Sequence, residues 1–346
     1  MNETNKGYIP VAFICDENYA LPTTVAITSI KLSRNSTTRY RIHVLGVGLS
    51  EDSKKRILAI KANDFDVDII ERSLNDQQAK VVQVRKRVTT AALLKFELPN
   101  IFPDLDKLLY LDSDMLIQQD LSELYNINLG EAYAGVVADT ITLWGDKHKE
   151  WLHFNEKVYF NSGMMLLNLR KMREDALPQR LLDYRLTGIN HFMDQDALNV
   201  VFGGNMKLVS PKYNLLNFFF SKQSIEDMNT LYQTEFSPCV EFNYINAAIL
   251  HFGDEKKPWK HYMGFLSELY RGVYNLSPYA DKELVLEGDP LNEINRLRNS
   301  YSYRIGRAIT FIPRKVPRGI KCLQENGIRY TIHHIYEKIC QKHNIK

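Results

Sequence analysis

The N-terminal part of the chain alternates between short apolar runs and longer segments in which apolar positions recur every three to four residues. Short apolar runs bounded by polar residues are typical of strands buried on both faces, and the longer pattern is typical of helices. Ser50 precedes the second helical segment, where its side chain can cap the helix. This order predicts an α/β domain with a parallel sheet. The predicted strands are 9–15, 41–47 and 66–70, and the predicted helices are 21–32 and 50–62.

Apolar runs and helical segments continue downstream without internal repeats or low-complexity segments. No G-x-G-x-x-G sequence follows the first predicted strand, so the usual dinucleotide-binding fingerprint is missing. The length fits one large domain with an appendage, or two domains. The further apolar runs are 107–111, 115–117, 134–138, 164–169 and 248–250, and the further predicted helices are 95–102, 178–186 and 191–202.

Two carboxylates, Asp112 and Asp114, separate the apolar runs 107–111 and 115–117. Residues i and i+2 of an extended chain point to the same side, so both side chains are expected to project together from the end of a buried strand. Carboxylates this close repel each other unless a proton, a cation or a hydrogen-bond network stabilises them. One explanation is a divalent metal such as Mg²⁺ or Mn²⁺. The other is a turn in which one aspartate caps the next segment.

Other polar residues that can bind a cation also follow predicted strands. Asp16 and Asp139 come directly after apolar runs, and His251 follows the run 248–250. In an open α/β sheet, ligands bind outside the carboxyl ends of the strands. Several acidic residues at one rim would be unfavourable without a cation, which favours the metal explanation for the two aspartates.

The composition is that of an ordinary soluble globular protein, with 346 residues of which 45% are hydrophobic and 25% charged. Residues 1–10 lack the apolar region of a secretory signal peptide, and no run of about 18 apolar residues predicts a membrane-spanning helix. The cysteines are far apart, which disfavours a disulfide framework or thiolate zinc site and favours a cytoplasmic protein. They are Cys15, Cys239, Cys322 and Cys340.

Positive charge is concentrated at the C-terminal end. Residues 296–346 contain twelve lysines and arginines but two glutamates, whereas the net charge of the whole chain is only +3. Isoleucines recur in this segment at helical spacing, so it is predicted to be a basic amphipathic region that lies on an anionic lipid surface. The alternative is a helix that packs on the rest of the protein with a solvated basic face. Nucleic acid is not expected as a partner, because a basic tail alone is weak evidence for it.

Five motifs occur in an order that resembles glycosyltransferase family 8, a group of retaining hexosyltransferases with the GT-A fold. The resemblance covers roughly residues 8–262. It implies a Rossmann-like nucleotide-sugar-binding domain with a mixed, mainly parallel sheet. The motifs are Asp16-x-Asn18-Tyr19, Leu109-Tyr110-Leu111-Asp112-x-Asp114, Phe160-Asn161-x-Gly163, Asp194-Gln195-Asp196, and His251 followed by Lys257-Pro258-Trp259.

The resemblance implies that Asp112, Asp114 and His251 bind Mn²⁺, with Mg²⁺ as the alternative, and that this metal holds the donor diphosphate. Lys95 stands where the family usually has an arginine, and lysine keeps the charge but lacks the planar fork of a guanidinium. The implied donor-binding set is Asp16, Asn18 and Tyr19 for uracil and ribose, Lys257 for the diphosphate, Asp139 and Asn161 for the sugar hydroxyls, and Lys95, Ser113 and Gly163.

The resemblance also implies that Asp194 and Gln195 are the catalytic residues, with Asp194 on the sugar and Gln195 near the anomeric carbon. A neutral amide oxygen is a poor nucleophile, which disfavours a double displacement through Gln195. Attack by the acceptor on the same face is favoured, with the leaving phosphate accepting the proton and Gln195 stabilising positive charge. The same residues also suit the start of a helix, where acidic side chains are stabilised by the helix dipole.

Together these features predict a metal-dependent hexosyltransferase that uses UDP-galactose or UDP-glucose and a saccharide or glycolipid acceptor, in lipopolysaccharide or other surface glycan synthesis. Residues 1–265 are predicted to form the catalytic domain and residues 266–346 a helical, basic, membrane-associating region. The expected location is the cytoplasm, peripheral on the inner face of the plasma membrane. Two alternatives are a non-catalytic protein that binds UDP-sugars or glycans and a phosphohydrolase of the D-x-D type.

Overall fold

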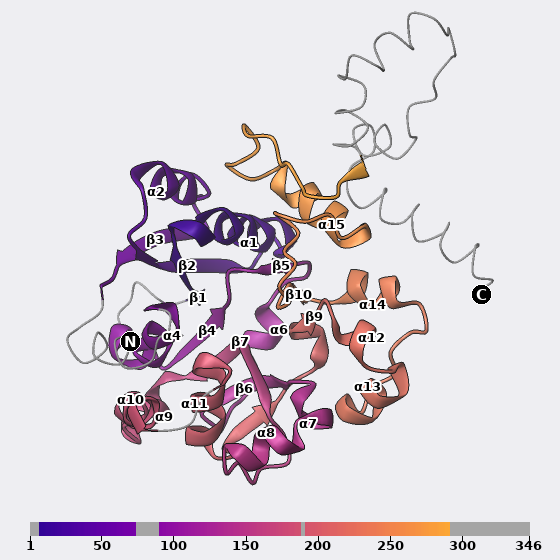
Figure 1. Ribbon diagram of the computed structural model, residues 1–346. Helices are drawn as coiled ribbons and strands as arrows, with labels where there is room; N and C mark the ends of the chain where they lie inside the picture. The colour runs from indigo at the N-terminus through magenta and orange to yellow at the C-terminus, as the bar shows by residue number, and fades with distance from the viewer. Residues whose placement is uncertain (1–6, 74–89, 188–190, 291–346) are drawn as a thin grey trace, which may run out of the picture.

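A seven-stranded sheet forms the centre of the protein (Figure 1). The computed structural model describes residues 7–73, 90–187 and 191–290. The strand order is β3-β2-β1-β4-β7-β6-β8, and neighbours are parallel except that β7 runs antiparallel to β4 and β6. The predicted α/β fold with a mixed, mainly parallel sheet is therefore confirmed. The strands are β1 (Tyr8–Asp16), β2 (Arg39–Val47), β3 (Phe65–Glu71), β4 (Lys107–Leu111), β6 (Ala134–Ala138), β7 (Phe160–Asn168) and β8 (Met206–Leu208).

Alternate residues of β1 enter two different parts of the hydrophobic core. Val11 and Phe13 pack in the cluster that includes α1 (Ala20–Ser33), whereas Ala12 and Ile14 pack in the cluster that includes α4 (Thr90–Phe96). Successive strand side chains point to opposite faces, so helices cover both faces of this part of the sheet. This explains why the first strand is a continuous apolar run rather than an alternating one.

The predicted elements of the first seventy residues are present with one change. Ser50 caps α2 (Glu51–Leu58) by accepting a hydrogen bond from the backbone N–H of Ser53, as the sequence predicts. The predicted extension of this helix to Ala62 is wrong. Ala62 and Phe65 instead exchange two backbone hydrogen bonds of 2.8 and 3.2 Å, which form a tight turn into β3.

Two other boundaries also differ from the predictions. The predicted helix 95–102 begins earlier, as α4, and is followed by the separate turn α5 (Leu98–Ile101) with Pro99 in its first positions. Proline lacks a backbone N–H and fits the first turn of a new helix better than a helix interior. The predicted run 164–169 begins too late and ends one residue too far, because β7 extends from Phe160 to Asn168 and Leu169 already belongs to α9 (Leu169–Glu174).

A smaller three-stranded sheet lies beside the large one. It consists of β5 (Met115–Ile117), β10 (Ile249–His251) and β9 (Leu215–Leu216), with β10 in the middle. The two apolar runs around Asp112 and Asp114 therefore belong to different sheets, and the aspartates occupy the connection from β4 to β5. This connection lies at the carboxyl end of β4, where the sequence places a ligand site.

The remaining helices surround the second half of the large sheet and the small sheet (Figure 1). The predicted helices 178–186 and 191–202 correspond to α10 (Leu177–Thr187) and α11 (Met193–Phe202). Asp194 lies in the first turn of α11 rather than at its cap, which is Phe192. The helices are α6 (Ser122–Tyr125), α7 (Ile141–Trp144), α8 (Asp146–Trp151), α10 (Leu177–Thr187), α11 (Met193–Phe202), α12 (Phe219–Lys222), α13 (Ile225–Tyr232) and α14 (Val240–Asn246).

The last described helix, α15 (Phe265–Tyr274), lies beside α1 (Figure 1). Its side chains Leu269, Tyr270 and Tyr274 are buried in the cluster that contains the small sheet. Arg56 of α2 forms a salt bridge with Asp281 and so holds the segment after α15 against the α/β unit. The basic segment 296–346 lies outside the described residues. Among the residues that the structure describes, no helix is long and apolar enough to span a membrane.

Candidate active site

The residues predicted to bind metal meet between the two sheets. Strand β10 pairs antiparallel with β5 so that His251 faces Met115, directly after Asp114. Asp112, Asp114 and His251 each offer one ligand atom, and these atoms lie within 4.8 Å of one another. His251 Nε2 is 3.2 Å from Asp114 Oδ1. Strand pairing thus brings together an aspartate and a histidine that are far apart in the chain.

Two lysines contact these carboxylates. Lys257 Nζ lies 2.7 Å from Asp114 Oδ2, and Lys95 Nζ lies 3.4 Å from Asp112 Oδ1. Burial favours a raised pKa for Asp114, but the charges of His251 and Lys257 outweigh burial and lower the pKa of this carboxyl. Burial raises the pKa of Asp112, and the charge of Asp114 adds to this against the opposing charge of Lys95. The two neighbouring aspartates therefore differ in how readily they ionise.

The backbone of Gly163 packs against this cluster. Its carbonyl accepts a hydrogen bond of 2.8 Å from the N–H of Asp112. A Cβ at this position would lie 2.4 Å from Cε1 of His251 and 3.0 Å from Oδ2 of Asp112, so glycine leaves these two side chains their space. Two carboxylates and one imidazole form a donor set that suits a divalent cation. The residues present therefore fit the metal that the motif predicts.

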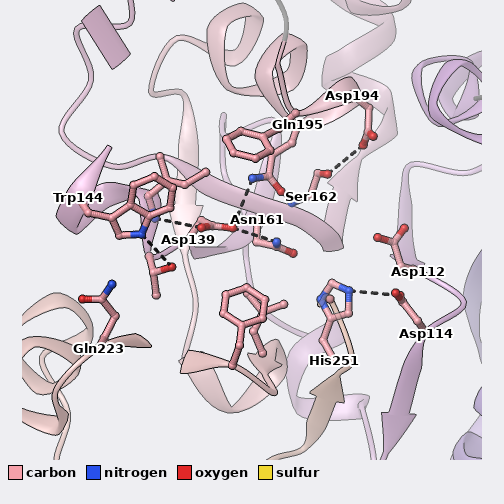
Figure 2. Close-up of a pocket in the computed structure, with 16 residues that line it drawn as sticks. Asp112, Asp114, Asp139, Trp144, Asn161, Ser162, Asp194, Gln195, Gln223 and His251 are labelled. Carbon is pink, nitrogen blue, oxygen red and sulfur yellow. Dashed lines mark hydrogen bonds and ion pairs between the residues drawn. The ribbon is translucent and has the colours of Figure 1, made fainter. Parts of the chain in front are cut away.

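A second group of polar side chains lies on the other side of the same cavity (Figure 2). Asp139 follows β6, Asn161 lies in β7, and Gln195 lies in the first turn of α11. Asp139 Oδ2 accepts hydrogen bonds from Asn161 Nδ2 at 3.0 Å and from Gln195 Nε2 at 3.3 Å. These three residues, taken from three elements, form one hydrogen-bonded unit.

Ser162 holds the two predicted catalytic residues. Its backbone N–H donates to Gln195 Oε1 at 3.1 Å, and its hydroxyl donates to Asp194 Oδ2 at 2.9 Å. In the sequence motif this position is an unspecified residue between Asn161 and Gly163. The fully buried Lys95 also contacts Asp194, at 2.6 Å, as well as Asp112. Lys95 therefore links the predicted metal ligands to the predicted catalytic residues.

The predicted nucleotide loop lies at the N-terminal edge of α1. Asp16 accepts a hydrogen bond of 3.2 Å from the backbone N–H of Tyr19, and the side chains of Asp16, Asn18 and Tyr19 are exposed. The Tyr19 ring makes an edge contact with Trp259, at 6.1 Å between centroids. Trp259 belongs to the loop that also carries Lys257. The first and last motifs of the chain therefore lie side by side.

The cavity has a volume of about 590 Å³. Seven of the predicted site residues line it: Asp112, Asp114, Asp139, Asn161, Asp194, Gln195 and His251. The other seven are not among its lining residues, and Ser113 is directed into the protein. Its hydroxyl donates to the carbonyl of Ile14 at 3.2 Å and accepts from Thr23 at 2.7 Å. A role for the Ser113 side chain in donor binding stays a prediction.

Besides Ser162, further residues of this region were not predicted from the sequence. Trp144, Phe218 and Gln223 line the cavity, and Asn214 is buried and contacts His251. None of them belongs to a motif. A single asparagine before the apolar pair Leu215–Leu216, or an exposed tryptophan at a helix end, is common in proteins without function, so the sequence alone offers little to find them.

A model of glycosyl transferase family 8 matches residues 10–262. A lipopolysaccharide 1,2-glucosyltransferase of Escherichia coli is 27% identical over 284 residues, which are 78% of this chain and 79% of the relative. A lipopolysaccharide 1,3-galactosyltransferase of Salmonella typhimurium is 24% identical over 283 residues, again 78% of this chain and 79% of the relative.

Solved structures show the same fold. The galactosyltransferase LgtC, in complex with donor and acceptor sugar analogs, has a TM-score of 0.66 at 21% identity, over 78% of this chain and 96% of LgtC. The apo structure of the bifunctional glycosyltransferase WbbM has a TM-score of 0.68 at 20% identity, over 81% of this chain and 51% of WbbM. These structures share the GT-A architecture of the described residues. Because the family model spans most of the chain, the protein belongs to glycosyltransferase family 8.

Proposed function

We propose that the protein is a metal-dependent, retaining hexosyltransferase that transfers galactose or glucose from a UDP-sugar to a saccharide acceptor. The observation that carries the proposal is the arrangement of one cavity. Ligand atoms of Asp112, Asp114 and His251 lie within 4.8 Å of one another, and Asp194 and Gln195 line the same cavity. The proposed site of the leaving diphosphate therefore adjoins the proposed site of the hexose that is transferred.

On the metal side, Asp112, Asp114 and His251 hold Mn²⁺, with Mg²⁺ as the alternative. When bound, the cation supplies Lewis-acid stabilisation of the charge that develops on the leaving diphosphate. Lys257 adds a second positive charge for the diphosphate, and the distance of 2.7 Å between its Nζ and Asp114 Oδ2 supports this role. The exposed ring of Tyr19, with Asp16 and Asn18, offers a stacking face and polar groups to the nucleoside.

On the sugar side, Asp139, Asn161 and Asp194 offer hydrogen-bond partners to the hydroxyl groups of the donor hexose. Gln195 Oε1 already accepts one hydrogen bond from Ser162, and its second lone pair is left to stabilise positive charge at the anomeric carbon. The acceptor oxygen attacks the face from which the diphosphate departs. A phosphate oxygen of the leaving group takes the proton of the acceptor hydroxyl, so configuration is retained without a covalent enzyme intermediate.

The acceptor saccharide binds in the outer part of the cavity, beyond Gln195. Trp144 and Gln223 lie on this side of the cavity (Figure 2). The Trp144 side chain is 55% exposed. Aromatic faces and amide groups are suited to sugar rings, which present both apolar C–H surfaces and hydroxyls. The names of the relatives favour lipopolysaccharide or another surface glycan as the acceptor. Residues 296–346, outside the described residues, are proposed to bind the protein to the anionic inner face of the plasma membrane.

The test is release of UDP from a donor panel of UDP-glucose, UDP-galactose and their N-acetyl forms, with acceptor, first with Mn²⁺ and then with EDTA. We expect release from one hexose donor that EDTA abolishes and Mn²⁺ restores. Donor binding without transfer or hydrolysis would instead support a non-catalytic binding protein. Full activity in EDTA would contradict the metal assignment. Membership of family 8 argues against the phosphohydrolase alternative, which predicts hydrolysis of aryl phosphates without acceptor.

A further inference from the structure

A buried asparagine connects the metal side of the cavity with the sugar side. Asn214 precedes β9 and has no exposed surface. Its Oδ1 lies 2.8 Å from Nδ1 of His251, and its Nδ2 lies 2.9 Å from Oδ1 of Asn161. Asn214 therefore contacts one predicted metal ligand and one predicted sugar-binding residue with the two ends of a single amide.

The hydrogen bonds that lead from Asp139 through the two asparagines to His251 can each be given a direction, starting at Asp139. Asp139 offers carboxylate oxygens, which accept, so the Asn161 atom 3.0 Å away is the NH₂ group. The backbone N–H of Gly163 can only donate, and it lies 3.0 Å from the other end of the Asn161 amide, which must be the oxygen. Two independent neighbours thus give the same orientation of Asn161.

The orientation of Asn161 determines that of Asn214 and then the proton position on His251. Since Asn161 presents its oxygen, Asn214 must present its NH₂ group, and its own oxygen must face His251. An amide oxygen accepts, so Nδ1 of His251 carries a proton. The remaining nitrogen, Nε2, faces Asp114 at 3.2 Å and is the one that can offer a lone pair to a cation.

We propose that Asn214 is a positioning residue that holds His251 with Nδ1 protonated and Nε2 directed at the cation, and that it holds Asn161 for the donor sugar at the same time. The inference rests on the proposed metal-dependent transferase. Asn214 then links the two sides of the cavity, because the orientation of the His251 imidazole and the position of Asn161 both depend on this one side chain. Partners behind a ligating histidine typically change metal affinity by about 10–100-fold when they are removed.

Two substitutions separate the two contacts. Asn214→Leu is similar in shape and removes both hydrogen bonds. Asn214→Asp keeps an oxygen that accepts from His251 but cannot donate to Asn161. Asn243→Leu is the matched control, since Asn243 is also buried and, among the described contacts, its side chain makes hydrogen bonds only to the backbone N–H and carbonyl of Ser237.

The experiment measures Mn²⁺ affinity of the full chain without donor, from the electron paramagnetic resonance signal of free Mn²⁺. Asn214→Leu is expected to weaken Mn²⁺ binding by about tenfold or more, whereas Asn214→Asp and Asn243→Leu stay within about threefold of the native protein. Asn214→Asp is then expected to lower kcat/KM for the UDP-sugar by about tenfold, because Asn161 Oδ1 no longer receives a hydrogen bond from residue 214. Circular dichroism of each variant checks that it is folded.

The outcomes are distinguishable from failure of the proposed function. If the native protein binds Mn²⁺ and Asn214→Leu binds it equally well, the role of Asn214 is wrong while the metal site stands. If Asn243→Leu loses as much affinity as Asn214→Leu, the effect is one of general stability and the proposal is overturned. If the native protein binds no Mn²⁺, the metal-dependent function fails and this inference fails with it.

Discussion

The two sides of the cavity are built from different interactions. On the metal side, ionised or ionisable groups face one another: Asp114 contacts His251 and Lys257, and Asp112 contacts Lys95. The sugar side is dominated by amides, with Asn161 and Gln195 donating to a single carboxylate, Asp139. A bound cation would compete with the lysines for these carboxylates, whereas the two amides are already hydrogen-bonded to Asp139. We therefore expect the lysines to shift when a cation binds, whereas the amides are already ordered by their own hydrogen bonds.

Substitution of Asp114 should give the largest effect, because this carboxylate contacts both the histidine and the lysine of the metal side. Asp114→Asn is expected to lower UDP release by a factor on the order of 10³ and to weaken Mn²⁺ binding. The measurement is kcat/KM with the preferred donor. Asp104→Asn, at an exposed position away from the cavity, is the control. A loss of less than tenfold for Asp114→Asn would show that the metal side is not essential.

A methyl group at residue 163 should disturb the metal side more than the sugar side. Its Cβ would lie 2.4 Å from His251 Cε1, so the imidazole has to move. Gly163→Ala is expected to weaken Mn²⁺ binding by about 10–100-fold and to destabilise the fold by about 1–3 kcal/mol. Gly135→Ala is the control, since its Cβ would meet side chains of the core at 3.2 Å or more. Native Mn²⁺ affinity in Gly163→Ala would contradict the crowding argument.

Loss of Trp144 should affect only the acceptor. Trp144→Ala is expected to raise the acceptor KM by about tenfold, the effect of one lost aromatic contact, while the donor KM stays within about twofold. Steady-state kinetics with the acceptor and donor varied in turn will separate the two. Trp151→Ala is a matched control, because Trp151 is also exposed, at 44%, but does not line the cavity. Equal effects of the two substitutions on the acceptor KM would contradict the assignment of Trp144 to the acceptor site.

The smallest effect concerns the stability of the protein in EDTA. Burial, reinforced by Asp114, raises the pKa of Asp112, so its folded form releases its proton at higher pH than its unfolded form, and stability falls as pH rises through that interval. Asp112→Asn should therefore raise the melting temperature at pH 7 by about 1–3 °C. The charges of His251 and Lys257 overcome burial and lower the pKa of Asp114. The ionised Asp114 carboxylate therefore stabilises the folded protein at pH values above the pKa that this residue has in the unfolded chain. Asp114→Asn should therefore lower the melting temperature in EDTA. Shifts in the same direction would contradict this difference between the two aspartates.

Most strands and helices follow from local pattern. Strand β1 is buried on both faces, so it is a continuous apolar run that sequence alone reveals, and Ser50 marks the start of α2 through a contact three residues away. Boundaries were less predictable, because the end of α2 depends on the turn between Ala62 and Phe65. The assignment of Asp112 and Asp114 to a connection between two sheets could not be predicted either, since β5 pairs with β10, far away in the chain.

By itself the sequence determined the order of elements, the five motifs and the residue types of the site, because these depend on spacing and side-chain chemistry. Only the tertiary structure decided which groups meet. It placed His251 beside Asp114 through strand pairing, made Lys95 a bridge between Asp112 and Asp194, and left room for the ligands only if residue 163 is glycine. It also brought Asn214 into contact with His251. Contacts between distant segments depend on how strands pair and pack, and that information is not present in any local stretch of the chain.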